Sequence, residues 1–283
     1  MKKISALLFV VMIVAFGGYL MSSPTDPSRS EPHKIEVGMG MTVRDLIERN
    51  NLKMGPREPQ GYVIDVDYLT DWMPIFFDDN WIALRVLEGA QSFDLPPGRT
   101  LQVTQRAGRI DGLAFRPFDQ PRSLSEMGDY IATLIATLEE KGWQPTVQIK
   151  IPSKPEDFDS NGKSLFAEMK SPTGSSLQMD LRDYGLAPKN ESFILSLDPN
   201  QTPTEKSKTY LLQVTVSNSE NEVSYGDLIY PRRIYELGEV QKELPLRYWI
   251  EDPDWTPEKA GMMPTTPEER ANAGSSKWKM PPK

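Results

Sequence analysis

The residues best suited to chemistry in this chain are a run of oxygen-bearing side chains near its middle. Asp157, Asp159 and Asn161 alternate along the sequence, Gly162 follows, and five residues separate that glycine from Glu168. Alternating side-chain oxygens can converge on one hard cation, the glycine permits a sharp turn, and the final carboxylate can bind through both oxygens. This spacing makes Asp157, Asp159, Asn161 and Glu168 candidate ligands for calcium.

Over these twelve residues the chain resembles the calcium-binding loop of EF-hand proteins. The flanking sequence departs from that family. Pro152 and Pro155 stand where the incoming helix would lie, and Pro172 leaves little room for an outgoing helix. The alternative is a solvated turn, rich in Asp and Asn, that links predicted strands at 146–151 and 165–170 and binds no cofactor.

A second candidate site is the aromatic segment at residues 71–81, which carries acidic side chains beside its aromatic ones. On an exposed loop this composition is typical of a binding patch with a charged rim. Inside the core the same side chains would simply pack, and the strand predicted at 81–87 favours packing. The residues of the candidate patch are Trp72, Phe76, Phe77 and Trp81.

The composition removes most catalytic constellations. The chain has no Cys and one His, so it can form no thiol nucleophile, disulfide, cysteine zinc site or multi-histidine metal site. His33 lies in a proline-rich stretch, where no predicted element orients it as a catalytic base. We therefore predict that the protein is not an enzyme. A carboxylate-dependent hydrolase remains the alternative, although no sequence rule selects its two acids.

The clearest element that could position such residues is a helix at 124–141. Ser123 and Glu126 form a capping box, and Gly142 supplies a left-handed cap after the last turn. Apolar residues repeat at intervals of three and four, which predicts one buried face. A shorter helix is predicted at 43–51, with Thr42 as its cap.

Most of the other apolar runs read as strands. Ala107-Gly108 separates two of them and predicts a hairpin, although alanine is a poor first residue for that turn. Strands before and after one helix predict an α+β fold: a mainly antiparallel sheet with one long helix packed on it, preceded by a single N-terminal membrane-spanning helix. The predicted strands lie at 34–37, 62–68, 81–87, 101–106, 109–116, 146–151, 165–170, 177–182, 193–197, 210–217 and 246–250.

The N-terminus predicts where the protein works. Lys2 and Lys3 precede 18 uncharged residues at 4–21, which as a helix span about 27 Å, close to the hydrocarbon thickness of a bilayer. The lysines favour an N-terminus in the cytoplasm, so the rest of the chain would face the periplasm from a single-pass anchor in a bacterial inner membrane. The alternative is a cleaved signal peptide and secretion to the periplasm, because Ala15 and Gly17 provide the small residues of a cleavage site.

The charge balance bears on partners. Lys and Arg total 32 against 40 acidic residues, a net charge of −8. This balance disfavours nucleic acid and favours a protein partner with a basic surface, in addition to the membrane contact of the N-terminal helix.

Proline-rich stretches divide the chain. An internal boundary is possible near 152–160, and Trp255 and Trp278 could hold part of the tail on the domain surface. The predicted parts are an anchor (1–21), a spacer (22–34), an exported α+β domain (35–251) and a largely disordered tail (252–283).

Together these features predict a membrane-anchored, periplasm-facing, non-catalytic protein that binds another protein. It would serve as an accessory of an envelope complex or as an immunity protein that neutralises an exported toxin. The alternatives are a calcium-binding envelope module that uses the loop at 157–168, and a carboxylate-dependent envelope hydrolase.

Overall fold

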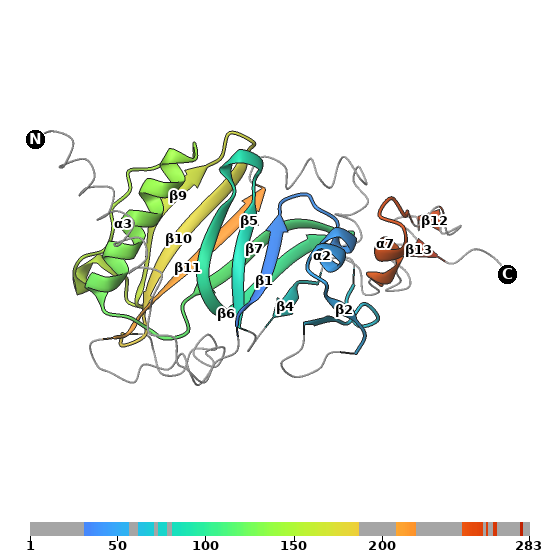
Figure 1. Ribbon diagram of the computed structural model, residues 1–283, viewed down its shortest axis with the longest axis horizontal. Helices are drawn as coiled ribbons and strands as arrows, with labels where there is room; N and C mark the ends of the chain where they lie inside the picture. The colour runs from blue at the N-terminus through green and yellow to red at the C-terminus, as the bar shows by residue number, and fades with distance from the viewer. Residues whose placement is uncertain are drawn as a thin grey trace, which may run out of the picture.

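The computed structural model describes residues 31–56, 62–70, 73–77, 81–186, 208–218, 245–256, 259, 263–264 and 278–279. This part of the chain is built around one nine-stranded sheet, with two further strand pairs and three α-helices (Figure 1). The elements in chain order are β1 (His33–Gly38), α2 (Val43–Arg49), β2 (Lys53–Met54), β3 (Val63–Ile64), β4 (Ile75–Phe77), β5 (Ile82–Leu87), the 3-10 turn η1 (Gly89–Gln91), β6 (Phe93–Arg106), β7 (Arg109–Pro117), α3 (Leu124–Glu140), β8 (Gln144–Pro145), the 3-10 turn η2 (Pro155–Asp157), β9 (Lys163–Lys170), β10 (Ser175–Asp183), β11 (Tyr210–Asn218), α7 (Arg247–Glu251), β12 (Met263–Pro264) and β13 (Trp278–Lys279).

The large sheet is mixed. Its strand order is β1-β5-β6-β7-β11-β10-β9-β8, and β4 pairs with β6 beside this path. β1 and β5 run parallel, whereas the other pairs in this sheet are antiparallel. Two smaller pairs lie apart from it, β2 with β3 and β12 with β13.

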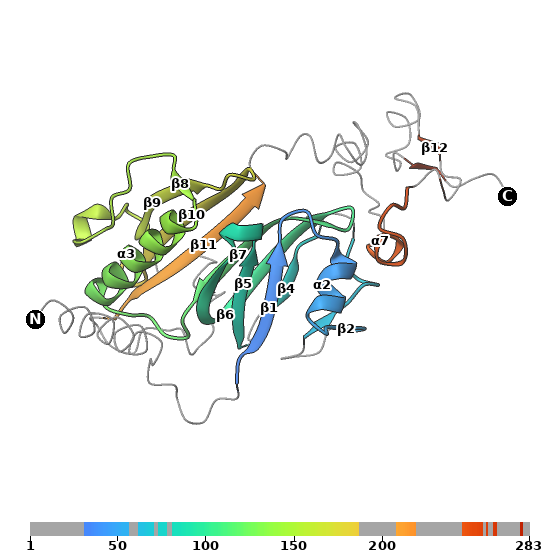
Figure 2. The ribbon, with the colours of Figure 1, turned by 45° about the horizontal axis from the view of Figure 1, so that its top comes forward.

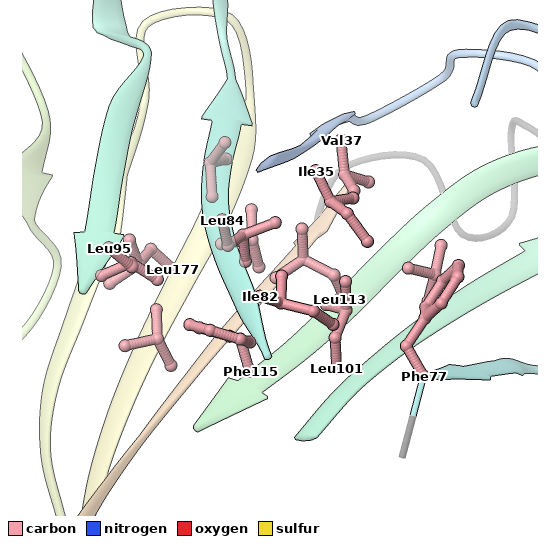
Figure 3. Close-up of a cluster of buried hydrophobic side chains, with 14 of the residues drawn as sticks. Ile35, Val37, Phe77, Ile82, Leu84, Leu95, Leu101, Leu113, Phe115 and Leu177 are labelled. Carbon is pink, nitrogen blue, oxygen red and sulfur yellow. The ribbon is translucent and has the colours of Figure 1, made fainter. Parts of the chain in front are cut away.

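The 14-residue strand β6 connects two parts of the large sheet, because different stretches of it pair with β5 and with β7. Its first part, from Phe93 to Gly98, pairs with β5, and its later part, from Thr100 to Arg106, pairs with β7. A Cβ at Gly98 would lie 2.0 Å from the carbonyl oxygen of Arg116, so only glycine allows this close approach. Apolar side chains of β1 and β5 lie together with those of β7 and β10 in one buried cluster (Figure 3).

The helix α3 covers the end of the sheet formed by β9, β10 and β11 (Figure 2). Both hydrogen bonds of the predicted capping box between Ser123 and Glu126 are present. Gly142 has a φ of +96°, and the N–H of Trp143 donates to the carbonyl of Leu138 at 3.0 Å. The buried face is made by Met127, Ile131, Leu134, Ile135 and Leu138, as the spacing predicts.

The predicted fold class was nevertheless wrong. The described residues form a large mixed sheet, in which β1 and β5 are parallel, with three short helices, of which the 17-residue α3 has the most residues, in place of the predicted long helix. No helix in this part of the chain has the length and apolar character needed to cross a membrane. The predicted anchor at 1–21 and most of the spacer lie outside the described residues. The parallel pairing of β1 with β5 was not predicted, because a long segment of chain separates the two strands and local alternation of side chains does not encode which strands pair.

Two predicted strands were also wrong, and of a third, at 62–68, only Val63 and Ile64 form a strand (β3), with a turn after them. The segment 246–250 forms the helix α7, in which Trp249 and Ile250 are buried. The segment 146–151 is irregular, and only Gln144 and Pro145 before it pair with β9. The strand predicted at 193–197 lies outside the described residues. The predicted hairpin is confirmed, with Ala107 and Gly108 at φ +46° and +73° between β6 and β7.

Candidate binding groove

Asp157, the first of the four candidate calcium ligands, caps a local turn. Its Oδ2 accepts hydrogen bonds from the N–H groups of Ser153 at 3.0 Å and Lys154 at 3.3 Å. Its Oδ1 lies 3.2 Å from Nζ of Lys150. The Ser153 N–H, followed by Lys150, lowers the pKa of Asp157. This carboxylate is therefore ionised and already engaged by groups of its own loop.

Asp159 and Glu168, two of the other candidate ligands, have hydrogen-bond partners of their own. Asp159 Oδ1 accepts from the N–H groups of Asn161 at 2.9 Å and Lys163 at 2.8 Å, which closes an Asx turn onto β9. Glu168 lies within β9, where its Oε1 accepts from Nε2 of Gln178 at 3.2 Å. The described part of the chain holds no group of three or more His, Asp or Glu side chains that could share a metal ion.

The aromatic segment is divided between core and surface. Phe77 is buried in β4, whereas Phe76 beside it points outward and is 42% exposed. Trp81 is half-buried, and its carbonyl accepts from the Tyr62 hydroxyl at 2.8 Å. Trp72 lies outside the described residues. Among the residues described, alternation along β4 sends neighbouring aromatic side chains in opposite directions.

His33 differs from its predicted place in a linker. It is the first residue of β1 and stacks on Tyr62 with ring centroids 4.0 Å apart. Its Nε2 lies 3.2 Å from the carbonyl of Asn50. Its described contacts are thus to an aromatic ring and to backbone, so they provide no carboxylate to orient it as a base.

The buried carboxylates join elements to one another. Glu88 Oε1 accepts from the hydroxyls of Ser171, at 2.7 Å, and Thr173, which links the end of β5 to the turn before β10. Asp183 Oδ1 accepts from the Thr209 hydroxyl at 2.6 Å. Asp180 lies 3.3 Å from Nε of Arg182 on its own strand and 3.8 Å from Nζ of Lys163 on β9. These contacts are structural links between neighbouring segments.

A cavity of about 700 Å³ lies at the carboxyl ends of β1 and β5. Its lining includes Gly38 and Gly40, in a turn that has no phosphate-binding lysine after it. Asp45 and Arg49 also line it, but Asp45 is engaged by Thr42 and Arg49 forms a 2.9 Å ion pair with Glu36. The polar groups of this cavity therefore serve the cap and flank of α2.

A groove of about 490 Å³ lies where the segment after β8 separates from β9. The N–H of Thr146 donates to Glu168 O at 2.9 Å, and the N–H of Lys150 donates to Phe166 O at 3.3 Å. Between these two bonds the chain leaves the strand edge, so that Val147 is 47% exposed and Leu165 is 50% exposed. The lining residues are Val147, Gln148, Lys150, Glu156, Asp157, Ser164, Leu165, Phe166, Ala167 and Glu168.

A local irregularity of β9 helps to place Leu165 in this groove. The register between β9 and β10 shifts between Met179 and Asp180, and Phe166 is the extra residue on β9. Ala167 and Phe166 are buried, whereas Leu165 stands opposite Asp180 and remains exposed. The bulge therefore leaves an aliphatic side chain in contact with solvent beside a buried apolar floor.

The rim of the groove is acidic. Lys150 is paired with Asp157, which leaves Glu156 and Glu168 without an ion-pair partner among the residues that the structure describes. The spacing of Asp157 and Glu168 predicted them as calcium ligands, whereas Val147 and Leu165 were not predicted to belong to a site. Both aliphatic residues fell inside predicted strands, so no sequence signal distinguished them from core residues.

Comparison of the chain with protein families, curated proteins and solved structures finds no match. The function is therefore argued from the chemistry of the groove and from the sequence.

Proposed function

We propose that this chain is a non-catalytic protein that binds another protein through the groove beside β9. The observation that carries the proposal is the pair of half-exposed aliphatic side chains, Val147 and Leu165, beside carboxylates in one cavity of about 490 Å³. Exposed aliphatic residues that gather at a cavity with a polar rim are characteristic of interaction sites, since their removal from water favours association.

The proposed location is the periplasmic side of a bacterial inner membrane. It is supported by Lys2 and Lys3 ahead of the uncharged segment 4–21, which lies outside the described residues. In that location the protein would act as an accessory of an envelope complex or as an immunity protein against an exported toxin. Both roles require a protein partner at the surface, so one experiment addresses both.

The absence of cysteine from the sequence makes a clean test possible. In the full chain, Leu165→Cys would carry one thiol-linked photo-crosslinker in the groove, and Met54→Cys, at a residue 56% exposed on β2, would carry the same group elsewhere. We expect light to produce a discrete adduct with another envelope protein from position 165 and not from position 54. Equal adducts from both positions, or none from position 165, would overturn the proposal.

A further inference from the structure

We propose, resting on the function proposed above, that the segment which occupies the groove carries an apolar side chain flanked by lysine or arginine. The source is another protein. Its apolar side chain would lie between Val147 and Leu165, and its cations would lie beside Glu156 and Glu168.

The apolar part of this inference follows from the floor and walls of the groove. Phe166 and Ala167 are buried in the sheet and contribute to the lining, while Val147 and Leu165 are half-exposed. An aliphatic side chain placed there removes apolar surface of both partners from water. A wholly polar segment would bury no apolar surface of its own against Val147 and Leu165, so these two side chains would contribute little to binding.

The positive charge follows from the balance of ionised groups. The lining holds three carboxylates and one ammonium group. Lys150 lies 3.2 Å from Asp157, so the charge of this lysine is already matched. Among the described residues, the carboxylates of Glu156 and Glu168 have no cationic partner, and the Glu168 carboxylate accepts from the uncharged amide of Gln178. Lysine or arginine on a partner would complement these two carboxylates and increase the association rate.

The same balance disfavours two other ligands. A phosphate or a nucleic acid would meet net negative charge at the rim. A calcium ion would need several converging oxygens, but Asp157 and Asp159 are turned toward backbone N–H groups of their own loop. Neither argument applies to an extended cationic segment, which can reach separate carboxylates at once.

The test uses the full chain and a defined probe, a fluorescein-labelled peptide of sequence Lys-Leu-Lys-Leu-Lys, with Glu-Leu-Glu-Leu-Glu as its counterpart. We expect fluorescence anisotropy to show that the lysine peptide binds and the glutamate peptide does not. The double variant Glu156→Gln and Glu168→Gln should weaken binding about tenfold, because two complementary charges are lost.

The matched control is Glu139→Gln with Glu140→Gln, two exposed residues of α3 outside the groove. It removes the same charge and should change the affinity by less than about twofold, because neither side chain lines the groove and exposed charges outside a site are screened by salt. If the control variant weakens binding as much as the groove variant, or if both peptides bind equally, the inference is wrong.

The two proposals fail in different ways. A crosslinked partner at position 165 together with no preference for the lysine peptide would leave protein binding in place and remove the cationic segment. Preference for the lysine peptide without any crosslinked partner would remove the proposed binding of an envelope protein. It would leave in place the preference of the groove for a cationic, apolar segment. Glu156 is exposed, and the Glu168 carboxylate contacts the amide of Gln178 while its backbone is unchanged by the substitution, so the Gln variants should retain the fold.

Discussion

Selected apolar side chains at the two ends of the molecule differ in how far they are exposed to solvent. At one end α7 lies beside α2 and the turn between β6 and β7, and at the other end lie β8 and β9 (Figure 2), of which β9 lines the groove. We call the first the α7 end and the second the groove end. Trp249 of α7 is 1% exposed over Gly108, whereas Leu165 in the groove is 50% exposed. Trp249 is thus enclosed by other residues of the chain, whereas Leu165 remains accessible to solvent.

Cooperating contacts close the α7 end. Nε of Arg44 donates to the carbonyl of Ile250 at 2.6 Å and its Nη2 donates to that of Glu251, so the last carbonyls of the short helix are satisfied. The N–H of Leu246 donates to Leu69 O at 2.9 Å. The groove end has only two backbone hydrogen bonds between the segment 146–150 and β9. The buried indole at Gly108 and the half-exposed Val147 and Leu165 therefore differ in how far their own chain encloses them, and this difference supports the groove as a binding site.

Removing the indole at the α7 end should have the largest effect. Trp249→Ala leaves a cavity over the turn at Gly108, and we expect the free energy of unfolding to fall by about 3–5 kcal/mol. Urea denaturation of the full chain, followed by tryptophan fluorescence and circular dichroism, measures this loss. A change below about 1 kcal/mol would mean that α7 does not contribute to the folded domain, and the contrast between the two ends would be lost.

The guanidinium that holds the end of α7 should come next. Arg44→Ala leaves two carbonyls without their donor, which should cost about 1–2 kcal/mol in the same denaturation experiment. Arg44→Lys is the informative control, because a single ammonium group cannot reproduce two donors in a planar fork. Full stability of the lysine variant would show that charge alone, and not the paired hydrogen bonds, stabilises this end.

Local signals predicted the elements that local chemistry controls. The capping box of Ser123 and Glu126 and the apolar spacing that follows it located α3, and Ala107-Gly108 located the hairpin. The pairing of β1 with β5 escaped prediction because the two strands are brought together by the core and not by adjacent residues. Residues 246–250 alternate too little to distinguish a buried helical turn from a strand, and the surfaces on which Trp249 packs, the turn at Gly108 and the ring of Trp255, are tertiary features.

The candidate site was predictable only in its charges. Glu168 and Asp157 were identified from their spacing, but a spacing rule does not show that Asp157 caps the turn at Ser153. The exposure of Leu165 depends on a bulge in β9 and on the departure of the segment after β8, both of which are tertiary features. The sequence alone could not show that this leucine differs from one in the core.

A smaller effect is expected from the carboxylate that caps α2 near the α7 end. The Thr42 hydroxyl donates to Asp45 at 2.7 Å and lowers the pKa of that carboxyl. Such a group stabilises the fold above its unfolded pKa of about 3.9, and the contribution is lost as the pH falls through the lower folded pKa. Asp45→Asn should therefore lower stability by about 0.5 kcal/mol at neutral pH, since the side chain is exposed, and by nothing at strongly acidic pH.

Denaturation at a series of pH values measures this difference, and Asp157→Asn provides the matching measurement at the groove end. The pKa of Asp157 is lowered chiefly by the Ser153 N–H, so Asp157→Asn should be less stable than the unsubstituted chain at neutral pH. This difference in the free energy of unfolding should disappear in strong acid. A deficit of either variant that persisted unchanged into strong acid would assign the effect to packing and not to ionisation.

The smallest change in stability is expected at the groove itself. Leu165→Ala removes methyl groups that are already half in water, so the free energy of unfolding should change by no more than about 0.5 kcal/mol. The same substitution at Leu101, which is fully buried in β6, should cost about 2–5 kcal/mol. Peptide anisotropy should reverse this order, because Leu165→Ala removes one wall of the groove while Leu101 lies in the core. If Leu165→Ala instead destabilised the fold as Leu101→Ala does, the leucine would belong to the core and the groove end would be closed by its own packing, as the α7 end is.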